Sequence, residues 1–214
     1  SDPTARVSAP RLSRLLPTTL TPEQVDSLLQ AFAPDDAEPM TWRQARDSAL
    51  LEVLYAAGAR ISEALGLTIE DLPPGYASVR LHGKGDKMRI VPLGKRARAA
   101  LELWIEVHRP ILLKASAGGG RSQTAIFLSR TCRPLDRPNA WRRVKDAARL
   151  AGLPSGISPH DLRHSFASHM LAGGADLRAV QEMLGHASIR TTEIYTHLDE
   201  DHVRAIHRMH HPRC

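Results

Sequence analysis

Six side chains of the kinds that act on phosphate esters are spread along this sequence. A guanidinium or imidazole can offset the charge of a phosphodiester, a histidine or lysine can move a proton, and a tyrosine oxygen can attack phosphorus. The set consists of two arginines, two histidines, one lysine and one tyrosine: Arg60, Arg163, His160, His186, Lys84 and Tyr195. Together they predict phosphoryl transfer through a covalent ester on tyrosine, with no metal ion.

Two members of this set share one predicted helix, at about 158–171. His160 and Arg163 stand three residues apart and therefore lie on one face, with His164 beside them. Pro159 suits the first helical turn, where the helix dipole favours an anion. This face is a candidate phosphate site, and the alternative is a structural histidine beside a surface arginine. His164 itself is expected to be structural.

The other four members lie at or near the ends of predicted elements. Arg60 precedes a short helix, Lys84 lies in a hairpin turn, and His186 follows Gly185, which suits the left-handed end of a helix. Tyr195 stands close to threonines and a histidine, a polar setting for a core tyrosine. Each has a structural alternative: an ion pair with a nearby glutamate, a solvated turn lysine, a plain helix cap and a core tyrosine.

The apolar pattern predicts a mainly α-helical fold with a small antiparallel β-sheet. Short alternating segments at 78–81 and 88–91 flank turn residues and predict a β-hairpin, and 126–128 predicts a further short strand. Apolar residues recur at helical spacing elsewhere. The predicted helices span about 22–32, 41–57, 62–67, 95–114, 137–151, 158–171, 176–184, 189–195 and 199–210.

Composition predicts one basic domain with a polyanionic partner. The chain has 214 residues, a net charge of +6 and a pI near 9.8. Segments 80–98 and 130–149 are rich in lysine and arginine, as a phosphate-facing surface requires, although solvated helix faces would show the same pattern. Two distant cysteines, Cys132 and Cys214, exclude a disulfide scaffold. No apolar run is long enough to insert in a membrane.

The sequence also lacks the patterns of the common phosphoryl-transfer cofactors. There is no GxxxxGK[ST] loop for a nucleoside triphosphate, and no acid-rich cluster of the kind that holds two metal ions in nucleases. We therefore expect no cofactor and no metal ion.

Five short segments resemble the tyrosine recombinases of the Xer type. Residues 58–63, 83–87, 158–164, 184–186 and 191–197 match the motifs of that family in the correct order. They cover nearly the whole chain, from about 20 to 198, and the resemblance implies the catalytic-domain fold of these recombinases. Within the family, the leader and residues 206–213 resemble the XerD subtype more than the XerC subtype.

The resemblance implies a role for each of the six residues. Arg60 and Arg163 would grip the scissile phosphate, and Lys84 on the hairpin would protonate the leaving 5′-hydroxyl. His160 would assist proton transfer at the nucleophile, and His186 would hydrogen-bond a phosphate oxygen. Tyr195 would attack phosphorus and form a 3′-phosphotyrosyl link, which conserves the energy of the broken bond, so that religation needs no ATP.

The resemblance also implies a domain organisation. Residues 1–20 would be a linker from a separate N-terminal DNA-binding domain that is absent here, and 21–198 would be the catalytic domain. Residues 199–214 would form a C-terminal helix and tail that docks into a neighbouring protomer. Packing of this helix onto its own core is the alternative.

The expected function is site-specific recombination of double-stranded DNA, in the cytoplasm. Resemblance to the XerD subtype implies chromosome dimer resolution, a XerC-like partner in a heterotetramer on DNA, and activation by an FtsK-like translocase. The alternatives are an integrase or transposon recombinase of the same family, a type IB topoisomerase, or a non-catalytic DNA-binding module.

Overall fold

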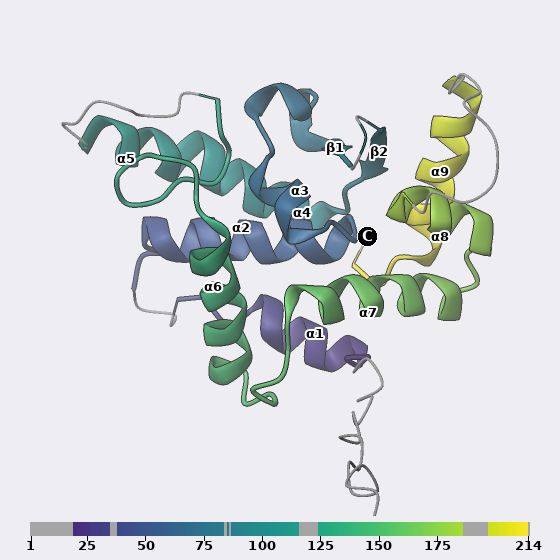
Figure 1. The fold of residues 1–214 in the computed structure, drawn as a ribbon, viewed down its shortest axis with the longest axis horizontal. Helices are drawn as coiled ribbons and strands as arrows, with labels where there is room; N and C mark the ends of the chain where they lie inside the picture. The colour runs from purple at the N-terminus through teal and green to yellow at the C-terminus, as the bar shows by residue number, and fades with distance from the viewer. Residues whose placement is uncertain are drawn as a thin grey trace, which may run out of the picture.

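The computed structural model describes residues 19–34, 38–83, 85, 87–115, 124–185 and 197–213, with the side chains of 197–202 left aside. Its α-helices are α1 (Pro22–Leu29), α2 (Trp42–Ala56), α3 (Ile61–Leu65), α4 (Lys95–Glu102), α5 (Arg109–Ala115), α6 (Arg137–Leu150), α7 (Pro159–Ala172), α8 (Leu177–Leu184) and α9 (His197–His210). Strands β1 (Ser78–His82) and β2 (Met88–Pro92) pair in one antiparallel hairpin (Figure 1). The fold class predicted from the sequence is confirmed. The helix expected at 189–195 lies outside the described residues.

Side-chain caps begin the first two helices. The backbone N–H of Gln24 donates to Thr21 Oγ1 over 3.2 Å, while Gln24 Oε1 accepts from the backbone N–H of Thr21 over 2.9 Å. Thr41 and Gln44 repeat this reciprocal pair at the start of α2. Each pair satisfies two backbone donors that a helix start would otherwise leave without partners.

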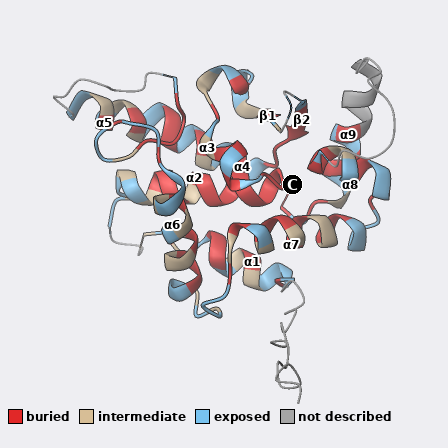
Figure 2. Ribbon diagram, in the orientation of Figure 1, coloured by how far each residue is buried: buried red, intermediate tan, exposed pale blue. Residues whose placement is uncertain are grey.

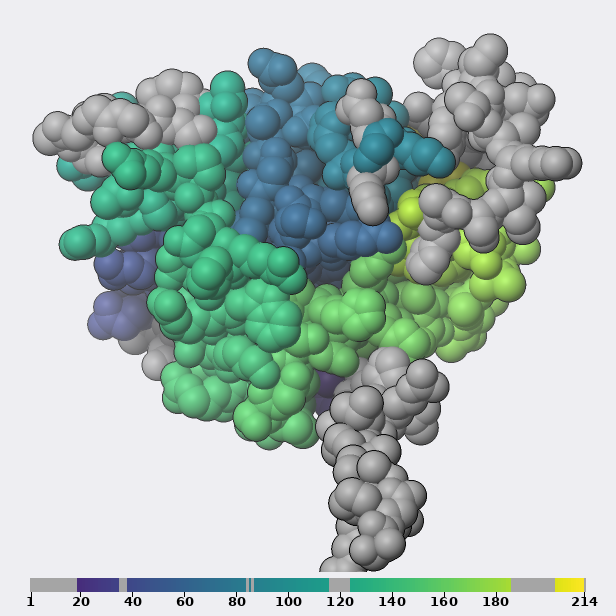
Figure 3. Space-filling view, in the orientation of Figure 1, coloured from purple at the N-terminus to yellow at the C-terminus, as the bar shows by residue number. Residues whose placement is uncertain are grey.

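Helix α2 runs through the centre of the core. Most of its residues are buried, including Leu50, Leu51 and Leu54, because α4 and α7 pack against it (Figure 2). In the space-filling view, the blue surface of residues of about 55–80 lies between the teal-green surface on the left and the green surface of α7 and α8 (Figure 3). Residues from distant parts of the sequence therefore meet around one helix.

A long helical stretch over 95–115 contains a π-helical segment, η3 (Leu103–His108), between α4 and α5. Trp104 in this segment is buried and donates from Nε1 to the carbonyl of Ile126 over 3.0 Å. Arg109 donates from Nε and Nη2 to the carbonyl of Ala125. These contacts hold the segment around Ala125 and Ile126 in the core.

The strand predicted at 126–128 is wrong. Only two isolated bridges form there, between Thr68 and Ala125 and between Leu128 and Pro134. The physical reason is that the backbone changes partner within the segment: the N–H of Ile126 donates to the carbonyl of Leu67, whereas the carbonyl of Phe127 accepts from the N–H of Leu135, so neither pairing extends into a ladder. Periodicity in three apolar residues indicates burial but does not identify the hydrogen-bond partner.

The hairpin packs beside the helices that carry the candidate residues. Its register pairs Ser78 with Pro92, and the backbone N–H of Gly83 donates to the carbonyl of Lys87 over 2.8 Å to close the turn. Strand β1 contacts α3, and strand β2 contacts both α8 and α9. The hairpin therefore connects the start of the domain to its end.

Helix α9 packs on its own chain, against α7, α8 and β2. Val203 and Ile206 are buried, whereas Met209 is 69% exposed. His207 faces inward instead, and one of its ring nitrogens lies 3.1 Å from the carbonyl oxygen of Ala56. Exchange of residues 199–214 between protomers stays a prediction.

The end of the chain joins α1 and α2 through ion pairs. Arg213 contacts Asp26 and Glu52 with its guanidinium, and His211 stacks on His207 with ring centroids 4.6 Å apart. Burial lowers the pKa of His207 to about 4, so this ring is neutral at neutral pH.

None of the helices in the described part of the chain is both long enough and apolar enough to cross a membrane.

Replacement of Leu54 by alanine tests the central position of α2. The side chain is fully buried, so Leu54→Ala should lower the free energy of unfolding by about 2–5 kcal/mol. Urea unfolding followed by circular dichroism measures the change. Leu150→Ala, at an exposed position of α6, is the matched control and should change the free energy by less than about 1 kcal/mol. Equal losses in the two variants would contradict the central role of α2.

Candidate active site

Arg163 joins three separate parts of the sequence. Its guanidinium lies on α7 and is largely buried. Nη1 donates to the carbonyl of Gly58 over 2.5 Å, and Nη2 donates to the carbonyl of Leu184 over 2.6 Å. Arg163 therefore fixes the loop that leads to Arg60 and the end of α8 that leads to His186.

The Glu63 carboxylate on α3 is the shared contact of the surrounding guanidiniums. Its carboxylate accepts from the backbone N–H of Arg60 over 2.7 Å and from Arg60 Nη1 over 2.8 Å. Arg89 on β2 donates to both carboxylate oxygens, over 2.9 and 2.8 Å. Arg163 Nη1 lies 4.0 Å from the same carboxylate. We call Arg60, Glu63, Arg89 and Arg163 the guanidinium cluster.

The guanidinium cluster carries an excess of positive charge. Three arginines face one carboxylate, which leaves two positive charges in excess within these four residues. Burial alone would raise the pKa of Glu63, but hydrogen bonds from Arg89 and Arg60 lower it to about 2. Burial, Arg60 and Arg89 lower the pKa of Arg163 to about 10, so it keeps its charge at neutral pH. Such a site attracts anions.

The ion pair between Arg60 and Glu63 is the structural alternative considered for Arg60 from the sequence, and it is present. It does not bury Arg60, whose side chain is 46% exposed, whereas the Glu63 side chain is 3% exposed. One side of the Arg60 guanidinium is therefore held by the protein while the rest faces solvent. This arrangement leaves donors for a ligand.

Glycines allow the close approach of these segments. Gly58 has φ +52°, and a Cβ built there would lie 2.5 Å from Phe166 Cδ1. Gly185 ends α8 in the left-handed conformation, φ +65°, and a Cβ there would lie 3.2 Å from Arg89 Cδ. The left-handed cap that the sequence predicts for Gly185 is confirmed.

The structure brings together the predicted site residues that it describes. Arg60 and Arg163 meet at Glu63, and His160 is exposed on the first turn of α7, three residues before Arg163. The other predicted site residues, Lys84, His186 and Tyr195, lie outside the described residues. The roles of all six predicted site residues stay predictions.

The described neighbours of two of those residues reach the guanidinium cluster. A Cβ built at Gly83 would lie 3.7 Å from Glu63 Oε1, and Gly185 lies next to Arg89. Gly83 and Gly185, which precede Lys84 and His186 in the sequence, therefore lie at this cluster.

The sequence analysis did not identify Arg89, and it considered Glu63 only as a local ion-pair partner of Arg60. Arg89 was one of several basic residues in segment 80–98, and its buried place on β2 depends on a carboxylate that lies far away in the sequence. The available signal was the strand pattern itself. An arginine at a strand position whose side chain faces the core needs a buried hydrogen-bond acceptor for its guanidinium.

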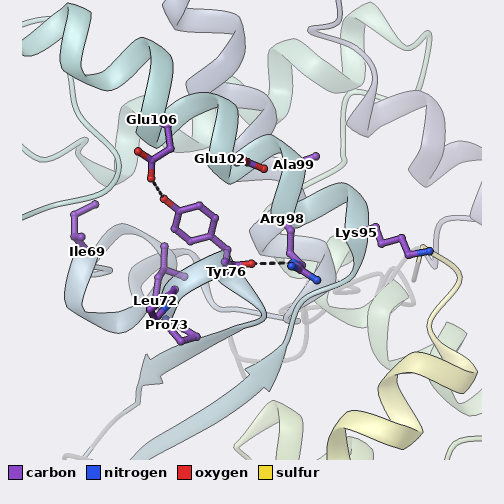
Figure 4. A pocket seen from close by; sticks show the side chains of 11 residues that line it. Ile69, Leu72, Pro73, Tyr76, Lys95, Arg98, Ala99, Glu102 and Glu106 are labelled. Atoms are coloured by element: carbon purple, nitrogen blue, oxygen red, sulfur yellow. Dashed lines mark hydrogen bonds between the residues drawn. The ribbon is translucent and has the colours of Figure 1, made fainter.

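A groove of about 780 Å³ lies elsewhere, between α4, η3 and the turn η2 (Pro74–Tyr76). In this groove the Tyr76 hydroxyl donates to Glu106, and Arg98 Nε donates to the carbonyl of Gly75 over 2.9 Å (Figure 4). None of the described members of the guanidinium cluster lines it. Among the described residues, no three His, Cys, Asp or Glu side chains are grouped to hold a metal ion.

The acid stability of the protein tests the Glu63 contacts. The folded-state pKa of Glu63 is about 2, below the ordinary value of 4.5, so its stabilising effect is complete above pH 4.5 and is lost as the pH falls toward 2. Glu63→Gln should therefore be less stable than the parent at pH 7, and this difference should shrink between pH 5 and about 3.

Urea unfolding at several pH values measures this difference. Glu70→Gln, at an exposed position nearby, is the control and should follow the parent at every pH. A difference between Glu63→Gln and the parent that is constant with pH would contradict the assigned contacts.

The sequence profile described as the phage integrase family matches residues 18–202. "Tyrosine recombinase XerD" of Corynebacterium glutamicum is 46% identical over 215 residues, which cover 100% of this chain and 68% of the relative. "Tyrosine recombinase XerD" of Yersinia pestis is 46% identical over 214 residues, again covering 68% of the relative. The chain thus spans about two thirds of the length of these curated relatives.

Solved structures agree with this assignment. XerA recombinase has a TM-score of 0.68 and 31% identity, over 92% of this chain and 66% of that chain. XerH site-specific recombinase, bound to its difH substrate, has a TM-score of 0.66 and 28% identity, over 89% of this chain and 50% of that chain.

The catalytic core of lambda integrase is 20% identical and supports the fold alone, with a TM-score of 0.55 over 82% of this chain and 96% of that chain. The expected catalytic-domain fold is therefore confirmed. The chain belongs to the phage integrase family and is a tyrosine recombinase related to the Xer type.

Proposed function

We propose that this chain exchanges DNA strands at a specific site through a 3′-phosphotyrosyl intermediate on Tyr195. The observation that carries the proposal is the excess positive charge of the guanidinium cluster, with His160 exposed on α7 three residues before Arg163. A phosphodiester gains negative charge as the nucleophile attacks, and pre-positioned guanidiniums offset that charge without reorganising.

The proposed reaction conserves the number of phosphoester bonds. The Tyr195 oxygen attacks the scissile phosphorus, a P–O bond to tyrosine forms, and the P–O5′ bond breaks. His160 accepts the tyrosine proton, and Lys84 donates a proton to the departing 5′ oxygen. Reversal of these steps with a different 5′-hydroxyl joins the strand to a new partner.

Arg60 and Arg163 bind the non-bridging oxygens in this proposal, with His186 as a further donor. Arg163 uses one N–H of each terminal nitrogen for a backbone carbonyl, and a guanidinium has five N–H donors. The remaining donors of Arg163 and the exposed part of Arg60 serve the phosphate. The carbonyl contacts set the direction in which those donors point.

Double-stranded DNA is the proposed substrate. Exposed arginines on α6 and around the hairpin and α4 supply phosphate contacts in this proposal. The described members of this set include Arg80, Arg96, Arg98, Arg142 and Arg149. Solved relatives support it, since XerH was crystallised with its difH substrate.

The proposed biological task is chromosome dimer resolution in the cytoplasm. The XerD names of relatives at 46% identity support this task. A XerC-like partner in a heterotetramer and an FtsK-like translocase are part of the same proposal. An integrase or transposon recombinase of this family is the alternative, and the DNA site would separate the two.

Trapping of the covalent intermediate tests the proposal. The site is first selected from random-sequence duplexes, and a nick is then moved base by base along one strand. A nick just beyond the scissile phosphate releases a short 5′-hydroxyl fragment, so religation stops and the adduct accumulates. The expected product is a DNA–protein band on a denaturing gel that retains a label at the 5′ end of the cut strand.

The chain contains three tyrosines, which provides a matched control. Tyr195→Phe should form no adduct, whereas Tyr76→Phe should form it at the parental rate. An adduct that persists in Tyr195→Phe, or a label retained from the 3′ end of the strand, would reject the proposed chemistry. Tight binding without any adduct would favour a non-catalytic DNA-binding module. Relaxation of any supercoiled plasmid would favour a topoisomerase.

A further inference from the structure

Arg89 has no part in the reaction proposed above, yet it is a buried cation at the centre of the guanidinium cluster. We propose that Arg89 is a positioning residue for phosphodiester transfer: it fixes the Glu63 carboxylate and, through that carboxylate, the Arg60 guanidinium. The inference rests on the proposed function and names a residue that acts through another.

All three nitrogens of the Arg89 guanidinium donate hydrogen bonds. Nη1 and Nη2 donate to the two oxygens of Glu63 over 2.9 and 2.8 Å, and Nε donates to the carbonyl of Met183 over 2.7 Å. A two-oxygen contact of this kind fixes the plane of the carboxylate as well as its position. Lysine carries the same charge on one nitrogen and cannot reproduce this geometry.

Glu63 has no acceptor capacity left for a second arrangement. An ionised carboxylate accepts about four hydrogen bonds. Two come from Arg89, and the other two come from the backbone N–H and the Nη1 of Arg60. The plane set by Arg89 therefore determines where Arg60 finds its acceptor.

Arg60 depends on this acceptor for its orientation. Within the described part of the chain, both hydrogen bonds that Arg60 donates go to Glu63. The Arg60 side chain is 46% exposed, so burial does little to hold it. A Glu63 carboxylate that rotates would leave the Arg60 guanidinium mobile in solvent, with a loss of the preorganisation that phosphate stabilisation requires.

Arg89 also sets the spacing between α3 and the end of α8. It holds the carbonyl of Met183, and Arg163 holds the carbonyl of the next residue, Leu184. A single strand residue thus connects the two arginines that are proposed to contact the phosphate. Arg163 is held by its own hydrogen bonds to the carbonyls of Gly58 and Leu184, whereas Arg60 has only Glu63, so a change of the Arg89 fork geometry acts on Arg60.

A double-mutant cycle tests the inference on the nicked DNA substrate defined above. Arg89→Lys should lower the maximal cleavage rate by about tenfold or more while the DNA dissociation constant stays within about twofold. Because Arg89 acts through Arg60, the double variant with Arg60→Ala should cleave within about twofold of Arg60→Ala alone.

A methylphosphonate at the scissile position gives a second readout. It replaces one charged oxygen with a methyl group and so removes the charge that Arg60 offsets. The deficit of Arg89→Lys relative to the parent should therefore shrink by about tenfold on this substrate. A variant that is only loosened in structure would show the same deficit on both substrates.

Arg109→Lys is the matched control. Arg109, on α5, is also buried and also donates to a backbone carbonyl, that of Ala125. It should lose thermal stability without the methylphosphonate effect, and its effect should multiply with that of Arg60→Ala. If Arg89→Lys does not fold by circular dichroism, Arg89→Gln measured at lower temperature serves in its place.

The outcomes separate this inference from the proposed function. A parent chain that forms no adduct overturns both. A parent that forms the adduct, with multiplicative effects of Arg89→Lys and Arg60→Ala and equal deficits on the two substrates, overturns the positioning role alone.

Discussion

The Glu63 carboxylate is the contact on which the arrangement of this domain depends. It receives four hydrogen bonds, from Arg60 and Arg89, and lies 4.0 Å from Arg163. Removing a carboxylate and guanidiniums from water costs several kcal/mol for each ion, and only near-complete hydrogen bonding offsets that cost. The carboxylate meets this condition, so α3, α7 and β2 are held in one arrangement by a polar contact at the edge of the core.

The balance of charge in this contact also explains why it can serve a reaction. A fully neutralised cluster would be a structural ion pair with little attraction for a ligand. Here the positive excess persists because the pKa of Arg163, lowered to about 10, still lies well above neutral pH. The same residues therefore hold the fold together and present an anion site. Loss of either property would accompany loss of the other.

Local chemistry made much of the fold predictable from the sequence. The hairpin turn and the left-handed Gly185 each act within a few residues, and each is present. The helical spacing of His160 and Arg163 was predictable for the same reason. These features depend on backbone geometry over one or two turns, which a sequence displays directly.

Contacts between distant residues were not predictable. The pair of Glu63 and Arg89 spans 26 positions, and no local rule connects a helix residue to a strand residue at that distance. The strand expected at 126–128 does not form because Ile126 and Phe127 pair with two different backbone segments, at Leu67 and at Leu135. In each case a tertiary partner decided between local options of similar energy.

The π-helical segment η3 has a consequence for insertions and deletions. A π-helix turns less per residue than an α-helix, so six π residues rotate everything after them by about a quarter turn relative to a continuous α-helix. The contact of Arg109 with the carbonyl of Ala125 comes directly after this segment and is made in that rotated phase. An α-helix shortened by one residue recovers nearly the same phase, since one residue of α-helix is about 100°. This part of the domain therefore accommodates the loss of a single residue, whereas a substitution that turned the π-helical segment into α-helix at constant length would rotate α5 out of this phase.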